Sequence, residues 1–152
     1  MSAGDILWTA RSGPTTLITL TGAIADGGLS ASGNATIATL DNTSTKHRFV
    51  DLELYLGASA TPTKDSVQVW LVPRLDGTNA LYGADGARDP ASAHSVGPIQ
   101  VPLAAGQWRN GLEGIGIGPY VYDAVVKNGT GVNLPSGTTL KAWTYSEAQA
   151  QS

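Results

Sequence analysis

The chain has 152 residues, a net charge of −3 at neutral pH and no cysteine, and only 14% of its residues are charged. This length suits one domain that buries enough surface to fold without cross-links. The lack of cysteine excludes disulfides, thiolate metal sites and cysteine nucleophiles, and the few dispersed basic residues exclude a nucleic-acid-binding surface. No segment approaches the ~20 apolar residues of a membrane-spanning helix, and the first eleven residues lack the basic and apolar parts of an export signal. We therefore expect neither nucleic acid nor a membrane as a partner.

The first third of the chain is predicted to contain two strands and a flexible connection. An apolar run at residues 6–10 precedes the breaker Ser12-Gly13-Pro14, and residues 15–21 alternate as a strand does. Residues 22–33 are rich in Gly, Ala and Ser and are expected to form a loop. An alternative interpretation is that residues 1–34 include an arm that becomes ordered only against a partner.

The clearest strand lies at residues 48–56, after a shorter one at residues 35–40. Its residues alternate between an aliphatic face and a mixed face. The aliphatic face is Val50, Leu52, Leu54 and Leu56, and the mixed face is Phe49, Asp51, Glu53 and Tyr55. This alternation is typical of an antiparallel sheet with one face on the core.

The next strand, at residues 66–72, leads into the longest irregular segment of the chain. Pro73 ends the strand because it cannot donate a ladder hydrogen bond, and Asp76-Gly77 is a strong turn signal. Residues 74–95 then show several further turn signals and no periodicity. Because long loops in compact domains usually have a function, we expect a contact surface here.

The remaining strands are predicted at residues 96–103, 108–117, 120–126 and 138–145. The prolines within the first of these favour an edge strand, and residues 146–152 are expected to be a flexible tail. About eight short antiparallel strands with no amphipathic helix predict a single all-β domain, a β-sandwich covering residues 1–152. A jelly roll is favoured, with an immunoglobulin-like sandwich as the alternative.

Several groupings resemble chemical sites without completing their patterns. The glycine-rich run at residues 111–118 lacks the following helix of a nucleotide loop and is interpreted as a bulged strand. Asp51 and Glu53 share a strand face like a glycosidase pair, but a solvated outer face is the favoured interpretation. The acidic residues of the long loop lack calcium-loop spacing, and the two histidines have no nucleophile motif nearby. The N-glycosylation pattern occurs at Asn34, Asn42 and Asn128, and we interpret these three matches as chance occurrences. We expect no catalytic residue, cofactor or metal.

Two tryptophans are predicted to contact a partner rather than the core. Trp70 and Trp143 stand opposite the main aliphatic faces of their strands, and exposed tryptophans are frequent anchors of interfaces. With residues of the long loop they make up a candidate interface, namely Trp70, Arg74, Asp76, Asn79, Tyr82, Asp85, Arg88, Asp89 and Trp143.

Two segments resemble small virion proteins of tailed phages, of the head decoration or cement type. They are Leu71-Val-Pro-Arg-Leu-Asp-Gly-Thr-Asn79 and Val125-Val-Lys-Asn-Gly-Thr-Gly-Val-Asn-Leu-Pro-Ser-Gly-Thr-Thr-Leu-Lys-Ala-Trp-Thr-Tyr145. In that family a strand ends in a Pro-x-x-Asp-Gly-Thr-Asn turn, and a Leu-Pro, Thr-Leu-Lys segment closes the domain. The similarity covers residues 49–147, and residues 87–90 and 111–118 have no counterpart in it.

The resemblance implies a β-sandwich on the outside of a phage capsid. It implies a homotrimer, made in the host cytoplasm and incorporated into the virion, that binds and stabilises the major capsid protein. It implies no enzymatic activity. We expect the contacts to come from residues 74–95 and from the N-terminal segment. The alternative is a carbohydrate- or receptor-binding module of a phage tail or head fibre that uses exposed aromatic residues.

Overall fold

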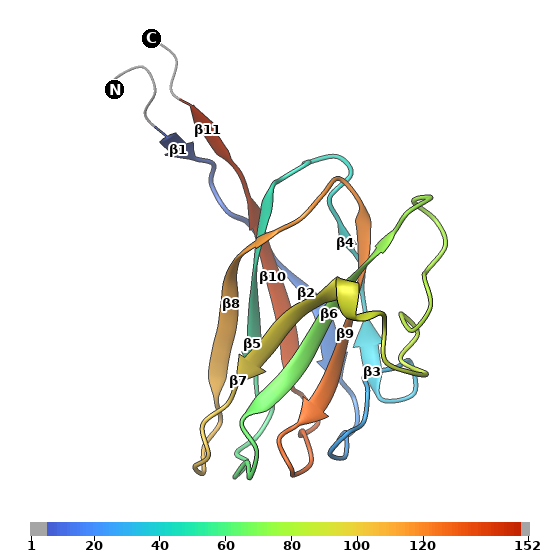
Figure 1. Ribbon diagram of the computed structural model, residues 1–152. Coiled ribbons are helices and arrows are strands. Elements are labelled where there is room, and N and C mark those ends of the chain that lie inside the picture. The colour runs from blue at the N-terminus through green and yellow to red at the C-terminus, as the bar shows by residue number, and fades with distance from the viewer. Residues whose placement is uncertain (1–5, 150–152) are drawn as a thin grey trace.

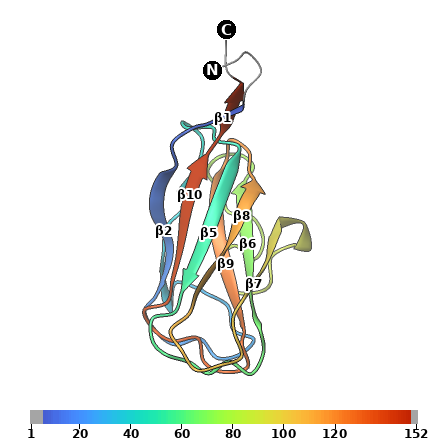
Figure 2. The ribbon, with the colours of Figure 1, turned by 90° about the vertical axis from the view of Figure 1, so that its left-hand side faces the viewer.

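Two antiparallel sheets pack face to face in the computed structural model, which describes residues 6–149 (Figures 1 and 2). The first sheet has five strands in the order β3-β2-β10-β5-β8, and the second has four in the order β4-β9-β6-β7. The strands of the first sheet are β2 (Ser12–Leu20), β3 (Ala35–Ile37), β5 (Phe49–Tyr55), β8 (Arg109–Gly116) and β10 (Thr139–Tyr145). Those of the second are β4 (Leu40–Asp41), β6 (Ser66–Arg74), β7 (Ser95–Gln100) and β9 (Val121–Gly129).

The connectivity is that of a jelly roll. Leaving aside β3, the sheets are β2-β10-β5-β8 and β4-β9-β6-β7, so that eight strands form two four-stranded layers. All of these pairings are antiparallel, as in the double Greek key of jelly rolls. The prediction of an all-β sandwich with jelly-roll topology is confirmed, and the immunoglobulin-like alternative is wrong.

The core lies between the sheets and follows the alternation of the sequence. The aliphatic faces of β5 and β10 are buried, and their other faces are half-buried. In β6, Val67, Val69 and Leu71 enter the same core, because successive strand residues point to opposite sides of a sheet. β7 forms the edge of the four-stranded sheet, as its prolines predicted.

Two local predictions for the first third of the chain are wrong. The breaker Ser12-Gly13-Pro14 lies inside β2, which accommodates it with register shifts against β10. The strand predicted at residues 35–40 divides into β3 and β4, which belong to different sheets. The loop predicted at residues 22–33 is attached to the rest of the chain by backbone hydrogen bonds. Ile24 and Leu134 exchange two backbone hydrogen bonds of 3.0 and 2.8 Å.

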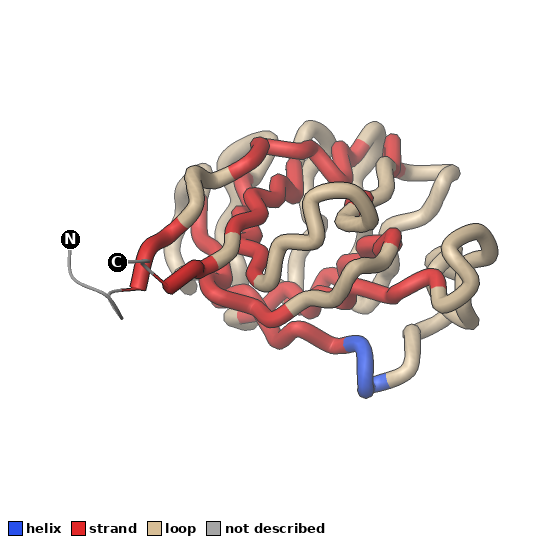
Figure 3. Tube along the Cα trace, turned by 90° about the horizontal axis from the view of Figure 1, so that it is seen from above, coloured by secondary structure: helices blue, strands red, loops and turns tan. Residues whose placement is uncertain are grey.

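Both ends of the described chain leave the sandwich together. β1 (Ile6–Trp8) and β11 (Glu147–Gln149) form a two-stranded antiparallel ribbon that projects from one end of the molecule (Figures 1 and 2). Viewed from above, the ribbon lies on the far side from the long loop and the short helix η1 (Ser92–His94) (Figure 3). Residues 147–149 of the tail predicted from residue 146 form β11, and residues 150–152 lie outside the described part. Within residues 6–149 no helix is long and apolar enough to cross a membrane.

Candidate functional site

The residues of the predicted interface lie on two opposite faces of the sandwich. Those of the long loop accompany the four-stranded sheet, whereas Trp143 lies in β10 of the five-stranded sheet. The structure therefore does not bring the nine residues together into one site. The two faces have to be considered separately.

Trp70 is buried, so the expectation that it is exposed for a partner is wrong. Its side chain does point away from the main core, but it is only 6% exposed. It forms a second apolar cluster with Val72 and Val125, against which Leu29 and Leu81 pack. The long loop thus covers part of the outer face of the four-stranded sheet. The alternation of residues along a strand shows which face Trp70 lies on, but it does not show whether another segment covers that face.

The charged residues of the long loop are engaged within the chain. Arg74 makes a two-pronged ion pair with Asp123 of β9, with both N–O distances at 2.9 Å. Asp89 accepts hydrogen bonds from Lys127 at 2.9 and 3.1 Å. These contacts attach both ends of the loop to β9, so its backbone is held by the sheet.

The turn after β6 is closed by a carboxylate. Asp76 accepts hydrogen bonds from the backbone N–H groups of Thr78 and Asn79 and from the Asn79 side chain. These bonds lower the pKa of Asp76 to about 2, the bond from the Asn79 backbone contributing most. Asp85 accepts a backbone bond from Ala87 in the same manner. Asp76, Asn79 and Asp85 thus shape the turns in which they lie.

Tyr82 and Arg88 form an exposed pair in the loop. The guanidinium of Arg88 lies 4.7 Å from the centre of the Tyr82 ring and donates a hydrogen bond of 2.6 Å to its hydroxyl. Tyr82 is 68% exposed. Of the predicted loop contacts, this pair is the one best placed to meet another molecule.

The outer face of the five-stranded sheet carries a repeated arrangement of arginine, aromatic ring and carboxylate. Each of three arginines lies over an aromatic ring, at 4.3 to 5.7 Å from its centre, and also pairs with an acidic side chain. The sets are Arg11 with Trp143 and Asp51, Arg109 with Tyr55 and Glu53, and Arg48 with Phe49 and Glu147. Aromatic residues and arginine are enriched at interfaces. This face therefore has the composition of a binding surface.

A groove of about 480 Å³ lies on this face and is called here the sheet groove. The residues that line it are Arg11, Asp51, Leu52, Glu53, residues 109–113 and Trp143. Asp51 is held in place by Arg11 at 3.1 Å, by the Gly114 N–H at 2.9 Å and by the Tyr145 hydroxyl at 3.0 Å. Burial, followed by the hydrogen bond to Asp51, raises the pKa of Tyr145.

The glycines of β8 form one wall of the groove. A Cβ atom on Gly111 would overlap the Leu52 carbonyl oxygen, so no larger residue fits there. Between Val50 and Leu52 the register with β8 shifts, and Gly114 has a φ of +64° at this point. The interpretation of the glycine-rich run as a bulged strand is confirmed.

Asp51 and Glu53, which share a strand face like the carboxylate pair of a glycosidase, each form an ion pair with an arginine in this groove.

A second exposed feature lies where the ribbon joins the sandwich. Trp8, Phe49 and Tyr145 form the terminal aromatic cluster, with ring centres 5.6 to 6.1 Å apart. Trp8 is held at an angle to both other rings but is still 62% exposed. A large apolar side chain that is both fixed and exposed is suited to bind a partner.

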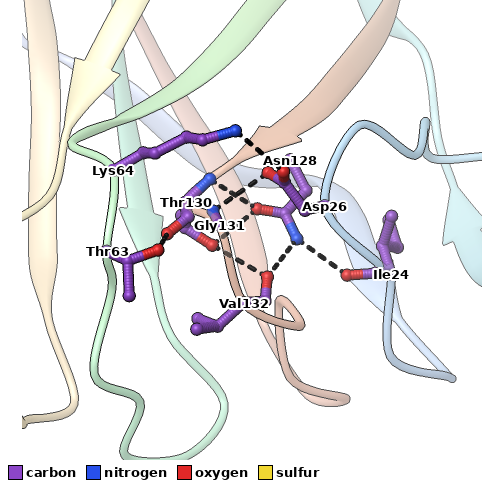
Figure 4. Close-up of polar contacts among 8 residues, drawn as sticks. All are labelled: Ile24, Asp26, Thr63, Lys64, Asn128, Thr130, Gly131 and Val132. Atoms are coloured by element: carbon purple, nitrogen blue, oxygen red, sulfur yellow. Dashed lines mark hydrogen bonds and ion pairs between the residues drawn. The ribbon is translucent and has the colours of Figure 1, made fainter.

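Asn128, in one of the three glycosylation patterns, is a structural residue. It is fully buried, and its amide donates to the carbonyls of Ile24 and Val132 while its oxygen accepts two bonds from Thr130 (Figure 4). Nearby, the Asp26 carboxylate accepts hydrogen bonds from the backbone N–H of Gly131 and from the Lys64 ammonium group. Asn42, in another of the patterns, is also fully buried, so both amides belong to the interior of the folded chain.

The described residues offer no grouping suited to a metal. Among them no three His, Cys, Asp or Glu side chains lie close enough together to hold an ion. His47 is hydrogen-bonded through Nδ1 to the Thr144 hydroxyl at 2.7 Å.

The sequence interpretation missed most residues of the two exposed surfaces. Arg11, Arg48 and Arg109 were not among the candidate residues, and Trp8 was covered only by the general expectation of contacts from the N-terminal segment. A usable signal was present on β5, where Phe49 and Tyr55 occupy the outward face together with two carboxylates. Aromatic residues that alternate with acidic ones on a wet face favour a contact surface rather than simple solvation.

Comparison of the chain with protein-family models, with curated proteins and with solved structures finds no match in any of the three. The function is therefore inferred from the arrangement of the chain's own residues.

Proposed function

We propose that this chain is a structural protein of a phage virion that binds the outside of the head and stabilises the major capsid protein. Two observations support the proposal. Residues 49–147 resemble decoration proteins of tailed phages, and the chain forms a jelly roll whose carboxylates in the sheet groove are held by arginine and backbone groups. Such held carboxylates favour a binding role over proton transfer, so the proposal includes no enzymatic activity.

The observation that carries the proposal is the exposed Trp8 at the ribbon end. Trp8 is fixed by the terminal aromatic cluster, and β1 and β11 pair only with each other among the described residues. Unpaired strand edges can accept a strand from another chain. We assign attachment to this end and not to the long loop, because most polar groups of the loop are engaged with β9 or its own turns.

The proposal also includes a homotrimer. The free edges of the ribbon allow copies of the chain to pair with one another around a symmetry axis. A trimer then makes the same modest contacts several times, which strengthens its binding to a symmetric lattice. The mass of the purified protein in solution tests this part. We expect about three times the chain mass of 15.6 kDa, and a chain that stays monomeric at micromolar concentration would contradict it.

Binding to capsids tests the proposal directly. The purified chain is mixed with expanded, undecorated heads of the phage that carries its gene, and the bound fraction is measured after sedimentation. We expect saturable binding that Trp8→Ala weakens by about tenfold or more, as for a hot-spot residue.

Leu103→Ala is the matched control for this experiment. Leu103 is also 62% exposed, and it lies in the β7–β8 loop at the end opposite the ribbon (Figure 1). We expect this variant to bind as the unchanged protein does. Absence of binding at saturating concentration contradicts the proposed function. Equal losses in the two variants contradict the assignment of attachment to the ribbon end.

A further inference from the structure

The sheet groove adjoins the end of the molecule to which attachment is assigned, and Arg11 borders both the groove and the hollow beside Trp8. It crosses β8, β5 and β10 on the outer face of the five-stranded sheet and reaches Arg11, the residue before β2. None of the three rings of the terminal aromatic cluster lines it. A protein attached by its ribbon end would leave this groove accessible along its side.

The charges of the groove are nearly balanced. Its lining has three carboxylates, from Asp51, Glu53 and Glu113, and two guanidinium groups, from Arg11 and Arg109. Arg11 pairs with Asp51 at 3.1 Å and Arg109 with Glu53 at 3.6 Å. A polyanion would need a surplus of positive charge, so the groove suits an uncharged polar ligand.

The polar groups are fixed before any ligand arrives. The backbone N–H of Gly114 and the Tyr145 hydroxyl both donate to Oδ1 of Asp51, at 2.9 and 3.0 Å, while Oδ2 faces Arg11. An ionised carboxylate has about four acceptor positions, so three such bonds leave one for a ligand hydroxyl. The carboxylate and the neighbouring guanidinium together offer an acceptor and donors side by side, which matches adjacent hydroxyl groups.

Trp143 supplies a flat apolar surface beside these groups. It stands directly opposite Asp51 in the β10–β5 pairing, and Arg11 lies 4.8 Å from its ring centre. Arg11 is half-exposed, and exposed ion pairs contribute little to stability. A ligand ring can therefore replace the guanidinium over the indole at small cost.

We propose that the sheet groove binds an oligosaccharide, with a sugar ring stacked on Trp143 and adjacent hydroxyls bonded to Asp51, Glu53 and the paired arginines. A sugar has an apolar ring face and many neutral hydroxyls, which is the combination that this groove offers. This inference goes beyond attachment to a capsid and does not depend on it. It gives the chain a second surface, for glycans at the exterior of a cell.

The test is a glycan array followed by titration of the purified full chain. The array carries defined neutral and acidic oligosaccharides, including repeat units of bacterial surface polysaccharides. Any oligosaccharide that binds is titrated by calorimetry and by intrinsic tryptophan fluorescence. We expect at least one neutral oligosaccharide to bind, with about tenfold or greater loss of affinity in Trp143→Ala and a clear loss in Glu53→Gln.

Tyr82→Ala is the matched control, because it removes an exposed aromatic ring on the opposite side of the sandwich. It should bind the oligosaccharide unchanged. Glu53→Gln keeps the size of a half-buried side chain and separates loss of binding from loss of folding. Absence of binding by any oligosaccharide on the array, or equal affinity of Trp143→Ala and the unchanged chain, overturns the proposal. So does a loss of capsid binding in Trp143→Ala without any glycan binding, which would make the groove a protein interface.

Discussion

Arg74 at the end of β6 and Asp123 in β9 form a two-pronged ion pair, with Nε and Nη2 each 2.9 Å from a carboxylate oxygen. Asp123 is buried, and the third arginine nitrogen donates to the Thr78 carbonyl at 3.0 Å. The hydrogen bonds that Arg74 donates to Asp123 are the main cause of its raised pKa. One side chain thus joins the four-stranded sheet to the turn that begins the long loop.

Arg74→Ala is expected to lower the free energy of unfolding by about 1–3 kcal/mol, because it leaves a buried carboxylate without its partner. Urea unfolding measures this change. Arg48→Ala, which removes an exposed ion pair with Glu147, is the control and should cost less than about 1 kcal/mol. Equal effects of the two substitutions would show that the Arg74–Asp123 pair adds nothing beyond a surface contact.

Gly111→Ala should destabilise the sandwich by about 1–3 kcal/mol or more, since its Cβ would overlap the Leu52 carbonyl oxygen. Gly116→Ala in the same strand is the control, because no atom lies within 4 Å of its Cβ position. Thermal unfolding of the two variants should separate them by several degrees. A Gly111→Ala variant as stable as Gly116→Ala would contradict the close approach of β8 to β5.

Asn128→Asp is expected to cost about 2–4 kcal/mol of stability. The substitution keeps the shape but replaces a donor to the Ile24 and Val132 carbonyls with a carboxylate oxygen, which they repel. Denaturant unfolding at neutral pH measures the loss.

The turn closed by Asp76 should weaken in strong acid. Its pKa is about 2 in the folded chain against 3.8 without the turn, so the stabilisation is fully present above about pH 4 and is lost as the pH falls through 2. NMR shifts of the Thr78 and Asn79 amides should follow this titration. A midpoint near 3.8 would mean that the carboxylate does not hold these amides, and in Asp76→Asn this titration should be absent.

The strand faces that point into the core could be predicted, because a strand with one buried face has an apolar side chain at every second position. In β5 every inward residue was assigned to the correct face, and the jelly roll followed from the number and spacing of such strands. Local alternation contains this information, so no long-range contact had to be known.

The contact surfaces could not be predicted in the same way, because they depend on residues distant in the chain. The cover over Trp70 comes from the long loop and from Leu29, and the place of Trp8 depends on β1 pairing with β11 across almost the whole sequence. Arg11 meets Asp51 only because β10 lies between β2 and β5. Turn residues such as Asp76 looked like contact residues because turns and interfaces use the same polar side chains.

The position of this chain in a density map of the intact phage particle tests the central claim most directly. We expect the jelly roll on the outer surface of the head, with the β1–β11 end and Trp8 toward the major capsid protein and the sheet groove facing away from the shell. A particle that lacks this density on its head, or one in which the end with the β7–β8 loop meets the capsid, would contradict the account.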